Sequence, residues 1–215
     1  MAVSQTIADS KRAFHQAFPH VIAPLYRRIA DELLVELHLL SHQSLFETNE
    51  LFSVGLCTVF DTFTKGYRPE AQTDALFSAL CSSNGFDAAK LRKSNASLVE
   101  QAKGKDLESL KSWLSSHSLK DGSHYSRLMA VGLMSLLKAA AEDAIGSETE
   151  AILNQSKELA ESLGLPSDRV EKDLTLFSSN SERMDQAVEL VNETIAAEKR
   201  KKERRLAEQA QGTSN

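Results

Sequence analysis

Residues 24–41, PLYRRIADELLVELHLLS, decide the fold class that the sequence predicts. Apolar residues occupy most sides of a helix drawn through this stretch, and one polar stripe of Arg28, Glu32 and Glu36 repeats every four residues. Such a pattern is typical of a helix that other helices surround, and Pro24 suits the first helical position. We therefore predict a helix here and place it at the centre of the core.

Turn signals on both sides of this stretch predict further helices. Only four prolines and nine glycines interrupt the 215 residues, and the alternating polarity typical of strands is absent. We therefore predict an all-α protein, with a single helical-bundle domain over residues 1–180 and an extended C-terminal helix over 181–215. The other predicted helices cover about residues 6–17, 49–65, the stretch from the 66–69 turn to 82, 87–103, 106–116, 125–144 and 147–164.

The last helix of the sequence shows apolar residues at heptad spacing from Val170 to Ile195. Ser181 interrupts that spacing, and Ser179 with Glu182 forms a helix-start pattern. The sequence leaves open whether the helix breaks there or continues. We expect the apolar seam to be buried up to Ile195 and the side chains beyond it to be solvated.

Two short segments repeat each other at an offset of 77 residues: LFSVGL at 51–56 and LMAVGL at 128–133. Each places a glycine, Gly55 or Gly132, inside a predicted helix, at a cost of about 0.5–1 kcal/mol relative to alanine. Close packing of another helix would offset that cost. We therefore predict that both glycines mark close helix contacts.

Composition sets the class of protein. No apolar stretch reaches the length of a membrane-crossing helix, and residues 1–12 resemble neither a signal peptide nor a transit peptide. We therefore expect the chain to act in the compartment where it is made. Cys57 and Cys81 are isolated and flanked by leucines, which favours two reduced core thiols over a disulfide.

Patterns for catalysis or metal binding are weak. His38 and His42 are spaced like two metal ligands on a helix, but no H-E-x-x-H or Glu-x-x-His motif accompanies them, so two partly buried histidines are the simpler interpretation. Glu32 and Glu36 could form an acid–base pair, although an ion pair of Glu32 with Arg28 at i,i+4 explains the spacing better. There is no glycine-rich phosphate loop. We predict no enzyme activity, no catalytic or metal site and no cofactor.

Charge is distributed unevenly along the chain. Six cations and three acids between Glu198 and Glu208 give that segment a net charge of +3. Since the whole chain has a net charge of −5, the rest of the chain has a net charge of −8. An acidic body with a basic tail predicts contact through the tail, with a solvated charged helix as the alternative. No aromatic residues are interleaved with the cations, and we expect no nucleic-acid binding. The candidate contacts for a partner or a membrane are Lys199, Arg200, Lys201, Lys202, Arg204 and Arg205.

Several blocks of the chain, up to about Ile195, resemble the thylakoid formation protein family of oxygenic phototrophs, also described as a photosystem II biogenesis factor. Two positions depart from the family pattern: Phe177-Ser178 stands where a tyrosine and an arginine are expected, and Ala23-Pro24 replaces a more polar pair. Where the family uses these positions for a partner, that contact is altered here. The blocks are residues 8–12 (ADSKR), 26–28 (YRR), 32–40 (ELLVELHLL), 60–63 (FDTF), 66–70 (GYRPE), 79–81 (ALC), and 172–174 (KDL) onward to 184.

The resemblance implies a function in photosynthetic membranes. Family members are expected to be peripheral on the cytoplasmic side of the cellular thylakoid membrane, in part soluble, and to associate with FtsH protease complexes and photosystem II-related membrane proteins during assembly and repair. Because no transit peptide is recognised, the chain resembles a bacterial member of the family rather than a chloroplast one. An anionic thylakoid lipid surface is a second candidate partner. The alternative function is lipid or chlorophyll handling in an internal apolar pocket lined by the second, third and seventh predicted helices.

Overall fold

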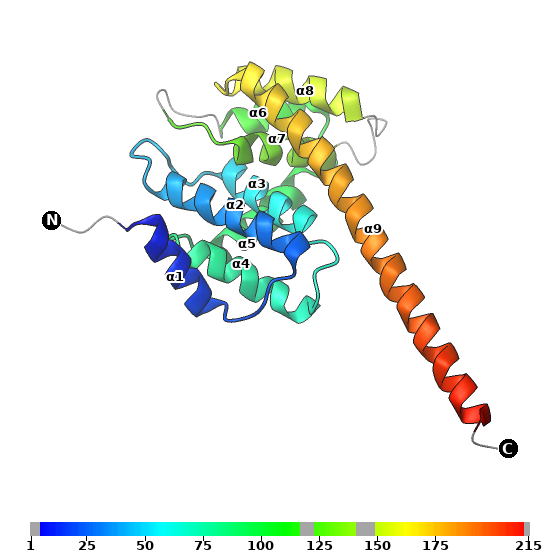
Figure 1. The fold of residues 1–215 in the computed structure, drawn as a ribbon. Helices are drawn as coiled ribbons and strands as arrows, with labels where there is room; N and C mark the ends of the chain where they lie inside the picture. The colour runs from blue at the N-terminus through cyan, green and yellow to red at the C-terminus, as the bar shows by residue number, and fades with distance from the viewer. Residues whose placement is uncertain (1–4, 117–122, 141–148, 213–215) are drawn as a thin grey trace. The chain divides into compact units, whose positions relative to one another are not determined.

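A computed structural model gives the fold of the protein (Figure 1). It describes residues 5–116, 123–140 and 149–212, with side chains except at 149 and 206–212. The regular elements in this part of the chain are all helical, which confirms the predicted class. The elements are α1 (Ile7–Ala17), α2 (Pro24–Ser41), α3 (Glu50–Phe63), the 3-10 turn η1 (Glu70–Gln72), α4 (Thr73–Ser82), α5 (Ala88–Ala102), α6 (Leu107–Ser115), α7 (Arg127–Ala140), α8 (Thr149–Ser162) and α9 (Ser167–Gly212).

The chain divides into two compact units, residues 1–178 and 179–215. α9 contributes to both units and runs as one uninterrupted helix from Ser167 to Gly212, so the helix continues through Ser179 and Ser181, where the sequence left a break open. The expected end of the 125–144 helix and the expected start of the 147–164 helix lie outside the described residues.

The centre of the core is the pair α3 and α7, and the prediction that α2 occupies this position is wrong. α3 and α7 pack against each other more extensively than any other pair of described elements, and α5 packs against both. α2 packs on α1 and α4 through one face, which includes Leu33, Leu34 and Leu37. Its opposite face is open, and Leu39 is 59% exposed there. Hydrophobicity on most sides of α2 therefore reflects one buried face and one partly apolar exposed face.

The two glycines explain why α3 and α7 approach so closely. A Cβ atom at Gly55 would stand 1.6 Å from the carbonyl oxygen of Leu128, and one at Gly132 would stand 2.0 Å from that of Leu51. Either side chain would collide with backbone of the other helix, which cannot rotate away as a side chain can. The prediction of close contacts at both glycines is confirmed, and each helix is the partner of the other.

Local caps set the starts of several helices. The side chains of Asn49, Asp87 and Asp106 accept hydrogen bonds from backbone N–H groups three residues on, as N-caps do. At the start of α1, Thr6 and Asp9 form a reciprocal capping box.

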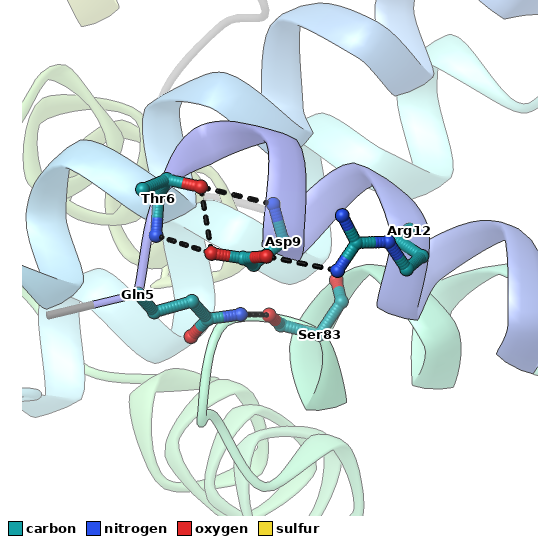
Figure 2. Close-up of polar contacts among 5 residues, drawn as sticks. All are labelled: Gln5, Thr6, Asp9, Arg12 and Ser83. Atoms are coloured by element: carbon teal, nitrogen blue, oxygen red, sulfur yellow. Dashed lines mark hydrogen bonds and ion pairs between the residues drawn. The ribbon is translucent and has the colours of Figure 1, made fainter. Parts of the chain in front are cut away.

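Figure 2 shows the Thr6–Asp9 capping box at the start of α1 together with the neighbouring polar contacts. Arg12 donates to the Asp9 carboxylate at 3.0 Å. Gln5 donates to the carbonyl oxygen of Ser83 at 2.9 Å, which ties the beginning of α1 to the end of α4.

Candidate functional site

The predicted contact segment lies on α9, and all six of its cations are exposed. Lys199 approaches Glu203 to 4.0 Å, and the Arg200 Nε donates to the backbone oxygen of Ala196 at 3.3 Å. At about 100° per residue the six cations are distributed around the whole circumference of the helix. A flat surface on one side of α9 therefore meets only some of them at once.

The exposed part of α9 begins earlier than predicted. Every residue from Glu189 to Arg205 is exposed, including Val191 at 44% and Ile195 at 55%. The expectation that the apolar seam is buried up to Ile195 is therefore wrong. Leu190, which did not belong to that seam, is exposed as well, at 65%.

A groove of about 1090 Å³ runs along the open face of α2. One wall is α2 itself, and the other is formed by residues 124–127, which lead into α7. Apolar side chains and charged side chains both line it, among them the ion pairs Arg28–Glu32 and Arg127–Glu36, so the groove suits a protein segment better than a small catalytic substrate. The lining includes Ile22, Arg27, Val35, Glu36, Leu39 and Arg127.

Two long-range polar contacts shape this groove, and sequence reasoning missed both. The guanidinium of Arg127 donates to Glu36 at 2.6, 3.0 and 3.1 Å, and these hydrogen bonds raise the pKa of Arg127. The hydroxyl of Tyr125 donates to the Asp173 carboxylate at 2.8 Å; burial first, and then this bond, raise the pKa of Tyr125. The partners are 91 residues apart in the first pair and 48 residues apart in the second, so no local sequence pattern predicts either pair. The Arg28–Glu32 pair, which was predicted, forms at 2.8 Å.

His38 of α2 and His42, which directly follows α2, make structural hydrogen bonds; His42 is exposed, so the expectation that both histidines are partly buried is wrong for His42. His38 is buried and its Nδ1 lies 2.9 Å from the hydroxyl of Ser10 in α1. His42 donates from Nδ1 to the carbonyl oxygen of His38 at 2.8 Å. Burial, and to a smaller degree His42, lower the pKa of His38. The pair thus joins α1 to α2, and within the described ranges no group of three or more His, Cys, Asp or Glu residues could hold a metal ion.

The cysteines are free thiols in the core, as predicted. Burial raises the pKa of Cys57 to about 11 and that of Cys81 to about 12, so neither thiol is reactive near neutral pH. In the portion of the chain that the structure describes, no helix combines the length and the apolar character needed to cross a bilayer.

Blocks that carry the family resemblance contact one another inside the body. Tyr26 and Tyr67 meet edge to face at 5.1 Å, so the YRR block of α2 lies against the GYRPE turn. Ser10 of the first block reaches His38 of the third. Phe177, which departs from the family pattern, packs edge to face on Phe63 with the ring centroids 5.7 Å apart. These contacts support the fold.

Asp61, also in a family block, forms a two-pronged ion pair with Arg92 of α5 at 2.7 and 2.8 Å. The same guanidinium stacks over the ring of Phe77 at 4.2 Å, a cation–π contact that joins α4 and α5. This cluster too is a support of the bundle.

Comparison with known proteins agrees with the family resemblance that these blocks carry. A family model described as "Thylakoid formation protein" matches residues 6–206. The chain is 88% identical to Protein Thf1 of Synechococcus sp. (strain CC9605) over the full length of both, and 38% identical to Protein Thf1 of Synechococcus elongatus over 92% of this chain and 84% of that one. A solved structure titled "Structure of Psb29 at 1.55A" is similar with a TM-score of 0.81 and 35% identity, covering 92% of this chain and 98% of the other. The chain belongs to the thylakoid formation protein family.

Proposed function

We propose that the protein is a non-enzymatic accessory factor of thylakoid biogenesis that supports photosystem II assembly and repair by binding FtsH protease complexes at the membrane surface. Family membership supports the part of this proposal that concerns thylakoids. The observation that carries the binding part is the segment 199–205, whose six cations are all exposed on a helix. Solvated cations on a helical arm provide long-range attraction to anionic partners without a catalytic group.

The proposed place of action is the cytoplasmic side of the thylakoid membrane, with exchange into the soluble fraction. An arm with a net charge of about +3 attracts an anionic surface by roughly 1 kcal/mol per unit of net positive charge, which supports reversible association and not permanent anchoring. Photosystem II-related membrane proteins are the second proposed class of partner.

Affinity isolation of the tagged full-length protein from solubilised thylakoids tests this function. The test variant replaces Arg200, Lys202, Arg204 and Arg205 by glutamine. A matched control makes four lysine-to-glutamine changes at exposed positions of residues 1–178, which alters the net charge equally; its sites are Lys11, Lys90, Lys93 and Lys111.

The parent and the control are expected to recover the protease, and the test variant to recover much less of it. Recovery of no FtsH subunit by the parent protein contradicts the proposed partner. Equal recovery by all three proteins shows that the tail is not the contact.

The groove along α2 is the second surface to test if the tail is dispensable. Leu39 is 59% exposed and lines the groove, so Leu39→Asp changes its surface without opening a cavity. We expect this change to lower recovery of the protease if the partner also contacts the groove on residues 1–178, and to leave it unchanged if it does not.

The alternative function, lipid or chlorophyll handling, requires an apolar cavity lined by α2, α3 and α7. The groove draws its lining from α2 and the segments at residues 22 and 124–127, with none from α3. At the two glycines, α3 and α7 meet backbone to backbone. No observation on this surface favours the alternative over the accessory function.

A further inference from the structure

Three exposed apolar side chains precede the cations of α9 and lie on one side of it. Leu190, Val191 and Ile195 are 65%, 44% and 55% exposed. At about 100° per residue, Val191 and Ile195 stand about 100° and 140° around the axis from Leu190. The three side chains therefore define an arc of about 140°, which we call the apolar arc of α9.

Net charge is distributed unevenly around the same axis. Lys201, Arg205 and Lys202 fall at about 20°, 60° and 120° from Leu190, so they continue the apolar arc towards the C-terminus. Glu198, at about 80°, also lies within it. Five acids between residues 182 and 205 fall outside the arc, at about 220–300°: Glu182, Asp185, Glu189, Glu193 and Glu203. Lys199, Arg200 and Arg204 also fall outside the arc, at about 180°, 280° and 320°. Over residues 182–205 the side of the arc, which also includes Arg183, thus carries a net positive charge, and the opposite side carries a net negative one.

We propose that the apolar arc, together with Lys201, Lys202 and Arg205, is a membrane-docking face that binds anionic lipid headgroups and inserts Leu190, Val191 and Ile195 shallowly at the headgroup–acyl boundary. The difference in net charge between the two sides carries the choice of occupant: Lys201, Lys202 and Arg205 meet the anionic headgroups, while the five acids on the opposite side stay in water. This inference deepens the proposed function, because it names the surface that α9 meets. It also replaces the view that α9 touches the membrane through its cations alone.

A vesicle-binding assay on the purified full-length protein tests the orientation of this face. The vesicles contain equal parts of phosphatidylglycerol and phosphatidylcholine, with pure phosphatidylcholine as the neutral comparison. One variant carries Lys202→Gln and Arg205→Gln, inside the arc. Its matched control carries Arg200→Gln and Arg204→Gln, which lie outside the arc at about 280° and 320°. Both variants lose the same charge from the same segment.

The variant inside the arc is expected to bind anionic vesicles about thirtyfold more weakly than the parent, since each cation at the surface contributes a factor of about five. The matched control is expected to lose less than about threefold, because its cations point away from the bilayer. Equal losses in the two variants would overturn the proposed face.

Insertion of the apolar side chains has its own test. Leu190→Ser with Ile195→Ser should weaken vesicle binding about tenfold. The control, Val21→Ser with Leu176→Ser, removes two apolar side chains that are 88% and 52% exposed elsewhere, and it should leave binding unchanged. Circular dichroism of each variant checks that the helices persist.

A fluorescent label then reports depth. Because Cys57 and Cys81 are buried with raised pKa values, an environment-sensitive maleimide dye should label Val191→Cys selectively. We expect a blue shift of that dye on anionic vesicles and no shift for dye on Glu193→Cys, on the acidic side. Absence of binding to any vesicle would overturn the lipid proposal. Because the vesicles contain no protein, this result is independent of the FtsH test.

Discussion

The crossing of α3 and α7 and the outer part of α9, residues 189–205, are both helical, yet they depend on different physics. At the crossing, two glycines bring backbones together, and the Cβ distances of 1.6 and 2.0 Å leave no room for another atom. Along outer α9 every side chain is exposed, and charged side chains are distributed around the helix. The first region is specified by shape and tolerates no added methyl group. The second is specified by charge and tolerates most changes in shape.

The largest expected effect is a double change at the crossing, Gly55→Ala with Gly132→Ala. Overpacking costs about 1–3 kcal/mol per site, and both sites should lie near the upper limit because backbone cannot move aside. We expect a loss of about 4–6 kcal/mol, enough to unfold a marginally stable domain. Urea unfolding followed by circular dichroism measures it. A double variant as stable as the parent would show that shape does not specify the crossing.

The same contrast can be sharpened within α2 by comparing its two faces. Leu37 is fully buried and Leu39 is 59% exposed. Leu37→Ala should cost about 3 kcal/mol through the cavity that it leaves, whereas Leu39→Ala should cost less than about 0.5 kcal/mol. Similar losses in the two variants would contradict the position of α2 at the edge of the core.

The ion pair across the groove should have a smaller effect. Arg127→Gln leaves Glu36, whose side chain is only 17% exposed, without its cation, but the Arg127 side chain is itself 44% exposed. After allowance for solvent screening we expect a loss of about 1 kcal/mol. Arg28→Gln is the control, because Arg28 and Glu32 are 86% and 50% exposed; it should change thermal stability very little. A larger effect in the control would show that burial of the pair is not what matters.

The smallest effect concerns pH. The pKa of buried His38 is lowered from its ordinary value of 6.5, so the unfolded chain takes up a proton first as pH falls. Stability from the neutral ring is complete above pH 6.5 and is lost as the pH falls from there through the lowered folded pKa. In urea unfolding at about pH 8 and about pH 5.5, His38→Gln should show a weaker pH dependence than the parent. A His38→Gln variant with the full pH dependence of the parent would contradict this role of His38.

Local features of the fold were predictable because their causes are local. The starts at Asn49, Asp87 and Asp106 follow from capping chemistry within one helical turn. The glycines at 55 and 132 signalled close packing because a mid-helix glycine needs compensation. Which backbone each glycine meets required the tertiary structure.

Features that depend on distant partners were not predictable. The sequence placed Glu36 only in the polar stripe with Arg28 and Glu32, because nothing near it in sequence points to Arg127. The sequence predicted a central α2, because a leucine that is exposed, such as Leu39, cannot be distinguished in the sequence from one that is buried, such as Leu37. Val191 and Ile195 continue a heptad pattern, but a pattern cannot reveal where its packing partner ends.

The most direct test of the account is the distribution of the full-length protein between thylakoid membranes and the soluble fraction. The four-glutamine variant at Arg200, Lys202, Arg204 and Arg205 should move to the soluble fraction, and its melting temperature should stay close to that of the parent, since all four side chains are exposed. Added salt should produce the same shift in the parent protein. Membrane association that survives both treatments would contradict the account and show that the cations of residues 199–205 do not provide the contact.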